Sequence, residues 1–397
     1  MYDDERCDRC DECRANKQTF CVKCGRSTGY AVAGGCDHCN ECFAKGYRYC
    51  IKCGRSAGNT DAAGGCDRCN ECTVVGYRYC IKCGRPTGNG EMRIEPAVRE
   101  SGFVKAAKTF GLIVFILSVP YIFFEIFTMF WVMGDVLPNV SYGVPLIYLT
   151  PSPEAIVMYG FVAEIYYLFL VAAVLVSFLF ILYESRDGIK EALGSKYKKL
   201  HDSPLFAVTA LFAATVAFNV ILNIFLSASG NEPGLPDFGD PWKEQFLLLN
   251  ASVWEEVLCR VLMIGLPLMI AGFLKSDKTP WKRLFGRFEM NNTAVFFIIV
   301  SAAIFSYAHL DGWDAFKLAP TFVTGLALGY LFVKYGVHAS IMLHFLIDYL
   351  TAPSWVLGND LGDELANLFL FAVIFMGALL FVWYLQRSIR FVKERMS

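Results

Sequence analysis

The sequence lacks an excess of charge of either sign. Its 36 Lys and Arg face 37 Asp and Glu, and the formal net charge is −1. A protein that binds nucleic acid mainly through phosphates needs a basic excess, so nucleic acid is not expected as a partner. The first hundred residues lack a long apolar run, so no secretory signal peptide is predicted.

Cysteine is almost missing from the remainder of the chain, where Cys259 is the single cysteine after Cys83. The other fifteen cysteines lie in the first 83 residues, and nearly all long apolar runs follow Lys108. This division predicts a small cysteine-rich head (1–88), a linker (89–108) and a polytopic membrane domain (109–397).

The head repeats the pattern C-x2-C-x2-C-x7-C-x2-C three times, at about 5–26, 34–55 and 64–85. Paired CxxC knuckles at this spacing are typical of four-cysteine zinc sites, so we expect zinc-ribbon-like repeats with about three structural zinc ions. Five cysteines per repeat is an odd number, which argues against a disulfide scaffold. Pairing of knuckles across repeats would leave both ends of the array without partners, so sites within each repeat are expected, with one spare cysteine each. Whether the spare is the first or the third cysteine of CxxCxxC, and hence which four of the five bind zinc, stays open. The candidate ligands are Cys7, Cys10, Cys13, Cys21, Cys24, Cys36, Cys39, Cys42, Cys50, Cys53, Cys66, Cys69, Cys72, Cys80 and Cys83.

The role expected for the head is contact with a protein partner. Residues 1–95 carry 15 Lys and Arg against 13 Asp and Glu. Three four-thiolate zinc sites would take this balance to about −4, which does not suit phosphate binding. We therefore interpret the head as a recruiting or regulatory module.

The membrane domain is predicted to be an all-α bundle of eight transmembrane helices in the lipid bilayer. The apolar runs lie at about 109–133, 156–183, 204–227, 244–274, 293–312, 316–334, 336–357 and 365–386. Basic residues gather in the loops 184–203 and 275–292 and in the C-terminal tail, while 134–155 and 357–364 have none. The positive-inside rule then predicts that both termini are cytosolic.

Three polar clusters interrupt the apolar helices between 244 and 350. In the first, SVWEEVLCRVLM, Glu255, Glu256 and Arg260 stand where a membrane helix favours leucine. Each charge costs ~2.5–3.5 kcal/mol at the centre of a spanning helix. At ~100° per residue, Arg260 lies about 40° from Glu256 and about 140° from Glu255. Arg260 is therefore expected to pair with Glu256 and to leave Glu255 free.

The second cluster, FSYAHL, carries His309 four residues after Phe305, and the third, HFLIDYL, carries His344 four residues before Asp348. The stretch GLALGYLFVKYG between them supplies small residues for close helix packing. Any one cluster has a purely structural explanation, such as an interhelical hydrogen bond. Three clusters on neighbouring helices, each with an acid or a base, favour one shared polar site.

These motifs, E-E-x-x-x-R, F-x-x-x-H and H-x-x-x-D, resemble in type and order those of the CPBP family. That family contains type II CAAX prenyl endopeptidases and bacteriocin self-immunity proteins, and the likeness covers about 244–350. The resemblance implies an intramembrane endopeptidase that acts on membrane-associated peptides, prenylated or C-terminal ones among them. It implies Glu255 as general base, His309 as its partner on a water, Glu256 and Arg260 as a supporting pair, and His344 with Asp348 as oxyanion stabilisers.

One residue departs from the family pattern, because many members have asparagine where this chain has Asp348. An ionised aspartate would repel an oxyanion, so we expect Asp348 to orient His344, which then acts as the donor. The family was also long labelled as metalloproteases, and two His with a Glu can bind zinc. The sequence has no HExxH motif, and a metal-free site is the preferred prediction.

Two other functions remain as alternatives. A non-proteolytic immunity or scaffold protein of the same fold would use the polar cluster only for stability. A transporter would use carboxylates and amides of other helices, for which Glu125, Glu164, Asn219 and Asn223 are the candidates.

Overall fold

The computed structural model describes Val74 and residues 101–145, 156–194, 196–230, 239–276, 278–310 and 315–396. The fifteen candidate zinc ligands and most of the linker lie outside the described residues. The zinc-ribbon repeats and the partner of the head therefore stay predictions.

The described part of the chain is almost entirely helical. Its α-helices are Gly102–Val140 (α4), Gly160–Leu193 (α5), Lys198–His201 (α6), Pro204–Ala228 (α7), Pro241–Asn250 (α8), Leu266–Leu274 (α9), Asn292–Ala308 (α10), Leu318–Tyr335 (α11), Val337–Asp348 (α12), Ala352–Leu357 (α13) and Asn359–Met396 (α14). Between α8 and α9 the chain forms two π-helical segments, Ala251–Glu255 (η2) and Val257–Gly265 (η3). Short 3-10 turns cover Pro280–Phe285 (η4) and Ala315–Lys317 (η5), and the strands Val144–Pro145 (β1) and Val157–Met158 (β2) pair antiparallel.

Six of these helical stretches are long and apolar enough to cross a membrane. They are Gly102–Val140, Gly160–Leu193, Pro204–Ala228, Pro241–Leu274, Ala315–Tyr335 and Asp360–Phe391. The chain is thus an all-α polytopic integral membrane protein. Two of the eight predicted spans, α10 and α12, are shorter than the other six.

The predicted helix 336–357 is wrong in its second half. The structure ends α12 at Asp348 and starts the separate helix α13 at Ala352. Pro353 explains the break, because proline has no N–H for a helix interior but is tolerated in a first turn. Helix α4 begins at Gly102, inside the predicted linker, where the Ser101 side chain accepts a hydrogen bond from the Val104 N–H.

Glycine and alanine allow the helices of the bundle to approach closely. A methyl group added at Gly325 of α11 would lie 3.0 Å from Cα of Ala302 on α10, and one at Gly329 would lie 2.9 Å from Ile298. Helices α10 and α11 therefore pack as the small residues predict. On the other side of the bundle α7 packs against α14, where a methyl at Gly377 would collide with the carbonyl oxygen of Ala213.

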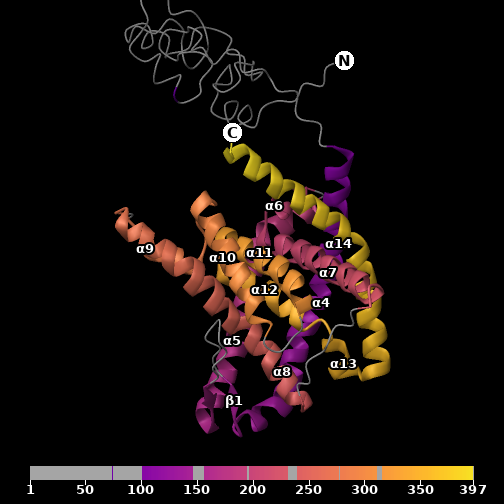
Figure 1. Cartoon of the computed structure of the whole chain (residues 1–397). Coiled ribbons are helices and arrows are strands. Elements are labelled where there is room, and N and C mark those ends of the chain that lie inside the picture. Colours follow the sequence, from indigo (N-terminus) through magenta and orange to yellow (C-terminus); the bar gives the residue numbers. More distant parts are fainter. Residues whose placement is uncertain are drawn as a thin grey trace, which may run out of the picture. The chain divides into compact units, whose positions relative to one another are not determined.

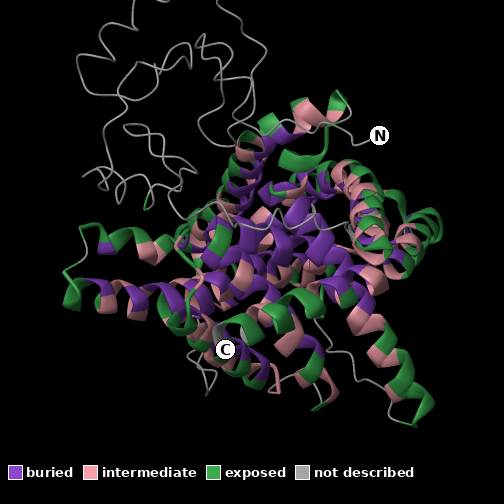
Figure 2. Cartoon of the chain, turned by 90° about the horizontal axis from the view of Figure 1, so that it is seen from above, coloured by how far each residue is buried: buried purple, intermediate pink, exposed green. Residues whose placement is uncertain are grey.

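The buried core runs through α12, which packs against α5, α7 and α11 (Figure 1). Eight consecutive residues, Ala339 to Leu346, are buried. The first half of α7, Pro204 to Ala217, is likewise buried throughout, and Figure 2 shows the buried residues gathered in the middle of the bundle. This core holds the third polar cluster away from lipid.

Candidate active site

The segment that carries the two glutamates is π-helical instead of α-helical. Segments η2 and η3 together cover Ala251–Gly265, interrupted at Glu256. The angles used to separate Glu255 from Glu256 assumed an α-helix, so that premise is wrong. Backbone hydrogen bonds of the i→i+5 kind widen the helix, and they occur frequently at functional sites.

Glu256 and Arg260 nevertheless form the predicted pair. Both side chains are fully buried, and Nε of Arg260 lies 3.3 Å from Oε2 of Glu256. Nη1 of Arg260 donates to Oγ of Ser301 on α10 at 2.7 Å, and the guanidinium lies 5.0 Å from the ring centre of Phe305. The arginine thus ties η3 to α10 and neutralises the buried carboxylate.

His344 approaches the same carboxylate from α12. Its Nδ1 lies 3.0 Å from Oε1 of Glu256, so Glu256 bridges Arg260 and His344. Because a carboxylate only accepts, we assign the proton of this contact to Nδ1. The other nitrogen, Nε2, then faces Oε2 of Glu255 at 3.8 Å and Oδ2 of Asp348 at 3.5 Å.

His309 is held in a similar way at the end of α10. It is the C-cap residue of α10, and its Nδ1 lies 2.8 Å from the carbonyl oxygen of Phe305. A carbonyl also only accepts, so Nδ1 carries the proton here too. Nε2 therefore presents its lone pair in the neutral ring, and it lies 3.9 Å from Oε2 of Glu255.

Glu255 is the carboxylate left outside the buried pair. Its side chain is 29% exposed, against 0% for Glu256. Its Oε2 atom is itself buried and has no hydrogen-bond partner within the described residues. The Nε2 atoms of His309 and His344 both face this atom within 4 Å, as the two distances above show. A water molecule that contacts both Glu255 and His309 fits ordinary hydrogen-bond lengths of ~2.8 Å.

Asp348 borders the same site from the last turn of α12. Its Oδ2 lies 3.0 Å from Oγ of Ser252 on η2. Lys317, at the end of η5, interacts electrostatically with Asp348 and Glu255. Sequence reasoning missed both Ser252 and Lys317. Ser252 is the first residue of the stretch SVWEEVLCRVLM, so its place beside the two glutamates was a weak indication of a role in the site. Lys317 lies outside all three polar clusters, so no motif indicated it.

Structurally, the six predicted site residues converge from three stretches of the chain: η2–η3, α10 and α12. The same donor types hold zinc in other hydrolases. No group of three or more His, Cys, Asp or Glu within the described ranges is placed to hold a metal ion. The histidine nitrogens would have to move closer to Glu255 for a zinc to bind all three.

The comparisons with known proteins point to the same region. Residues 242–350, about a quarter of the chain, match a family model described as Rce1-like, Type II CAAX prenyl endopeptidase. No curated protein and no solved structure matched the chain. The matched residues contain all three polar clusters, so the part of the chain that forms this site is similar to a family of membrane proteases.

Proposed function

We propose that the protein is an intramembrane endopeptidase in which Glu255 and His309 activate a water molecule. The observation that carries the proposal is the convergence of two imidazole Nε2 atoms on one unpartnered carboxylate oxygen. Both Nδ1 atoms face acceptors, which fixes the direction of the two rings. Such a constellation suits proton transfer during hydrolysis.

In the proposed reaction, Glu255 accepts a proton from the water while the water oxygen attacks the carbonyl carbon of the substrate. The carbonyl π bond breaks, and the oxygen becomes an oxyanion. The oxyanion then collapses to restore the carbonyl, and Glu255 delivers the proton to the leaving nitrogen as the C–N bond breaks. His309 accepts a hydrogen bond from the water at Nε2 and positions it.

His344 is the proposed donor to the oxyanion. When both ring nitrogens carry protons, Nδ1–H donates to Glu256 and Nε2–H is available to the substrate. Asp348 supports this role as an acceptor 3.5 Å from Nε2, held by Ser252. This arrangement makes Asp348 a positioning residue and removes the need for it to face the oxyanion.

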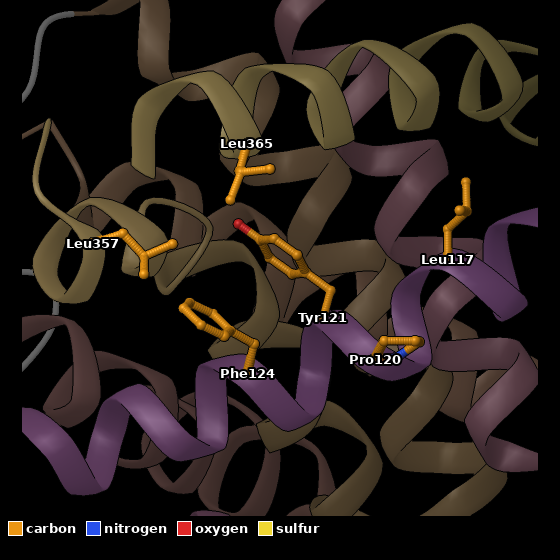
Figure 3. Close-up of a pocket in the computed structure, with 6 residues that line it drawn as sticks. All are labelled: Leu117, Pro120, Tyr121, Phe124, Leu357 and Leu365. Carbon is orange, nitrogen blue, oxygen red and sulfur yellow. The ribbon is translucent and has the colours of Figure 1, made fainter. Parts of the chain in front are cut away.

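The proposed substrates are membrane-associated peptides that carry an apolar group near the cleaved bond. An apolar cavity of about 270 Å³ lies between α4 and the α13–α14 region, lined by Leu117, Pro120, Tyr121, Phe124, Leu357 and Leu365 (Figure 3). The Tyr121 hydroxyl donates to the carbonyl oxygen of Leu350, two residues beyond Asp348. One lining residue therefore contacts the chain just after α12, and a prenyl chain of the kind named in the family description is the proposed occupant of the cavity.

The proposal also covers the orientation of the chain in the membrane and the role of the cysteine-rich head. Both termini face the cytosol, and the zinc-ribbon-like repeats recruit substrates or regulate access to the site. The uneven distribution of Lys and Arg among the loops supports this orientation.

The test is cleavage of a fluorogenic peptide with a farnesylated cysteine four residues from its C-terminus. Glu255→Gln is expected to lower kcat by about 100-fold to 10,000-fold, the range for loss of a general base. Glu164→Gln, which alters a membrane carboxylate of α5, is the matched control and should keep wild-type activity. Full activity of Glu255→Gln would refute the mechanism, whereas absence of cleavage by the wild-type protein would favour the scaffold alternative. Proteomics with the same two variants would then identify natural substrates.

A further inference from the structure

Glu125 is a buried carboxyl group that the proposed mechanism does not use. It lies on α4, is fully buried, and neither of its oxygens has a hydrogen-bond partner among the described residues. Tyr121, one turn before Glu125 on the same helix, donates to the carbonyl oxygen of Leu350, two residues beyond Asp348. This hydrogen bond places the Glu125 region of α4 against the end of α12.

Two further unpartnered polar atoms belong to helices that meet α4. They are the hydroxyl of Tyr167 on α5 and Oε1 of Gln245 on α8, and both side chains are buried. Helices α4, α5 and α8 all contact one another. Within the described residues, the structure gives none of these atoms a protein partner.

Tyr349, directly after α12, stands among these groups. Its hydroxyl donates to the carbonyl oxygen of Gln245 at 3.2 Å. The ring of Tyr167 lies 6.4 Å from that of Phe246, the residue after Gln245. Buried polar groups of α4, α5 and α8 therefore occur where these helices meet one another and the end of α12.

The energetics disfavour a dry contact among these groups. Each buried polar atom without a partner costs about 1–3 kcal/mol, and four such atoms lie here, two of them on Glu125. A buried water molecule makes 2–4 hydrogen bonds and serves donors and acceptors alike. Water suits the mixture of hydroxyl, amide and carboxyl groups better than a cation, which would leave hydroxyl donors unused.

We propose that Glu125, Tyr167, Gln245 and Tyr349 bind a cluster of water molecules, and that this cluster supplies the hydrolytic water past Asp348. The inference rests on the proposed function for its role, because a site inside a bilayer has no bulk water around it. It makes Glu125 a positioning residue that holds water and does not touch the substrate.

The test of the cluster is hydroxyl-radical footprinting by X-ray radiolysis, read by mass spectrometry on the full chain in nanodiscs. Tyr167 and Tyr349, both 1% exposed, should be labelled because bound water generates radicals beside them. Phe212, equally buried in the apolar core, is the control and should stay unlabelled. Labelling of the two tyrosines no greater than that of Phe212 would overturn the proposal.

The variants separate this proposal from the proposed function. Glu125→Leu should reduce labelling of both tyrosines and lower kcat about tenfold, a change of 1.36 kcal/mol, with KM unchanged. Glu125→Gln retains hydrogen-bonding groups and should restore both readings. Glu255→Gln should lower kcat by about 100-fold or more and leave labelling as in the wild type. Where Glu125→Leu does not fold, Tyr167→Phe is the substitute variant, because it removes one hydroxyl that binds the water cluster. Labelling of Tyr349 that is unchanged in Tyr167→Phe would count against the cluster.

Discussion

His344 and Glu256 are joined by a contact of 3.0 Å between Nδ1 and Oε1, both atoms inside the protein. Arg260 lies near the other oxygen of Glu256, at 3.3 Å. One buried carboxylate thus fixes the direction of a proposed catalytic imidazole and balances an arginine. Adjacent glutamates, Glu255 and Glu256, thereby have different surroundings, one buried between Arg260 and His344 and the other partly exposed.

Replacing Glu256 by glutamine should impair catalysis without removing the general base. An amide has one oxygen acceptor, so it cannot accept fully from both Arg260 and His344. We expect kcat to fall about 10–100-fold, the effect typical of losing a hydrogen-bond partner that orients an active-site side chain. Steady-state cleavage of the farnesylated peptide measures this, and KM should change little. An unaltered kcat would show that His344 needs no orientation by Glu256.

Removing Arg260 should lower the stability of the fold, and not only the rate of the reaction. Arg260→Met leaves Glu256 as a buried charge without its arginine partner, which costs about 3–5 kcal/mol. The double variant Glu256→Gln/Arg260→Met removes both charges and should recover much of that loss. Circular dichroism during heating in detergent gives the unfolding midpoints. If the losses of the two single variants simply add in the double variant, the pair is not coupled.

The polar clusters show how far residue types and spacing predict a site. The i, i+4 spacings of Glu256 with Arg260 and of His344 with Asp348 bring these side chains to 3.3 and 3.5 Å of each other in the structure. Spacing along one helix is local information, so it is readable from sequence. The contact between His344 and Glu256 spans 88 residues and depends on how α12 packs, which no local pattern contains.

The helix boundaries were less predictable for a related reason. Hydropathy continues from α12 through Leu357, yet the chain turns at Tyr349 and restarts at Ala352. The π-helical turns of η2 and η3 also cannot be predicted from a helical periodicity of ~100° per residue. Lys317 was missed because a single lysine beside an apolar helix has no spacing signature.

Asp348 should tolerate asparagine better than leucine. The amide oxygen of asparagine can still accept from Oγ of Ser252, which lies 3.0 Å from Oδ2. Leucine offers no acceptor to Ser252 or His344, so Asp348→Leu should lower kcat about tenfold or more. Peptide cleavage by the two variants, at matched expression, provides the comparison. Equal loss in both would mean that the negative charge itself is required.

Gly377 should be intolerant of even one added methyl group. Its Cβ would collide with the carbonyl oxygen of Ala213, a backbone atom of α7 that cannot turn aside. Gly377→Ala should therefore cost about 1–3 kcal/mol of stability, as overpacking does. Gly134→Ala is the matched control on α4, because nothing lies within 4 Å of its Cβ. There alanine should be neutral or stabilising by up to about 1 kcal/mol. Equal midpoints on heating for the two variants would contradict the tight α7–α14 contact.

Elemental analysis of the full chain tests the metal content of both parts. We expect about three zinc ions per chain, one for each cysteine repeat. Cys24→Ser should lower this to about two, because Cys24 is a ligand whichever cysteine of CxxCxxC is spare. Cys7→Ser and Cys13→Ser are then compared by their zinc content. The variant that still binds three zinc ions identifies the spare cysteine of the first repeat. About four zincs in the wild type, falling to three in His309→Ala, would place a zinc in the active site and contradict the water mechanism based on Glu255.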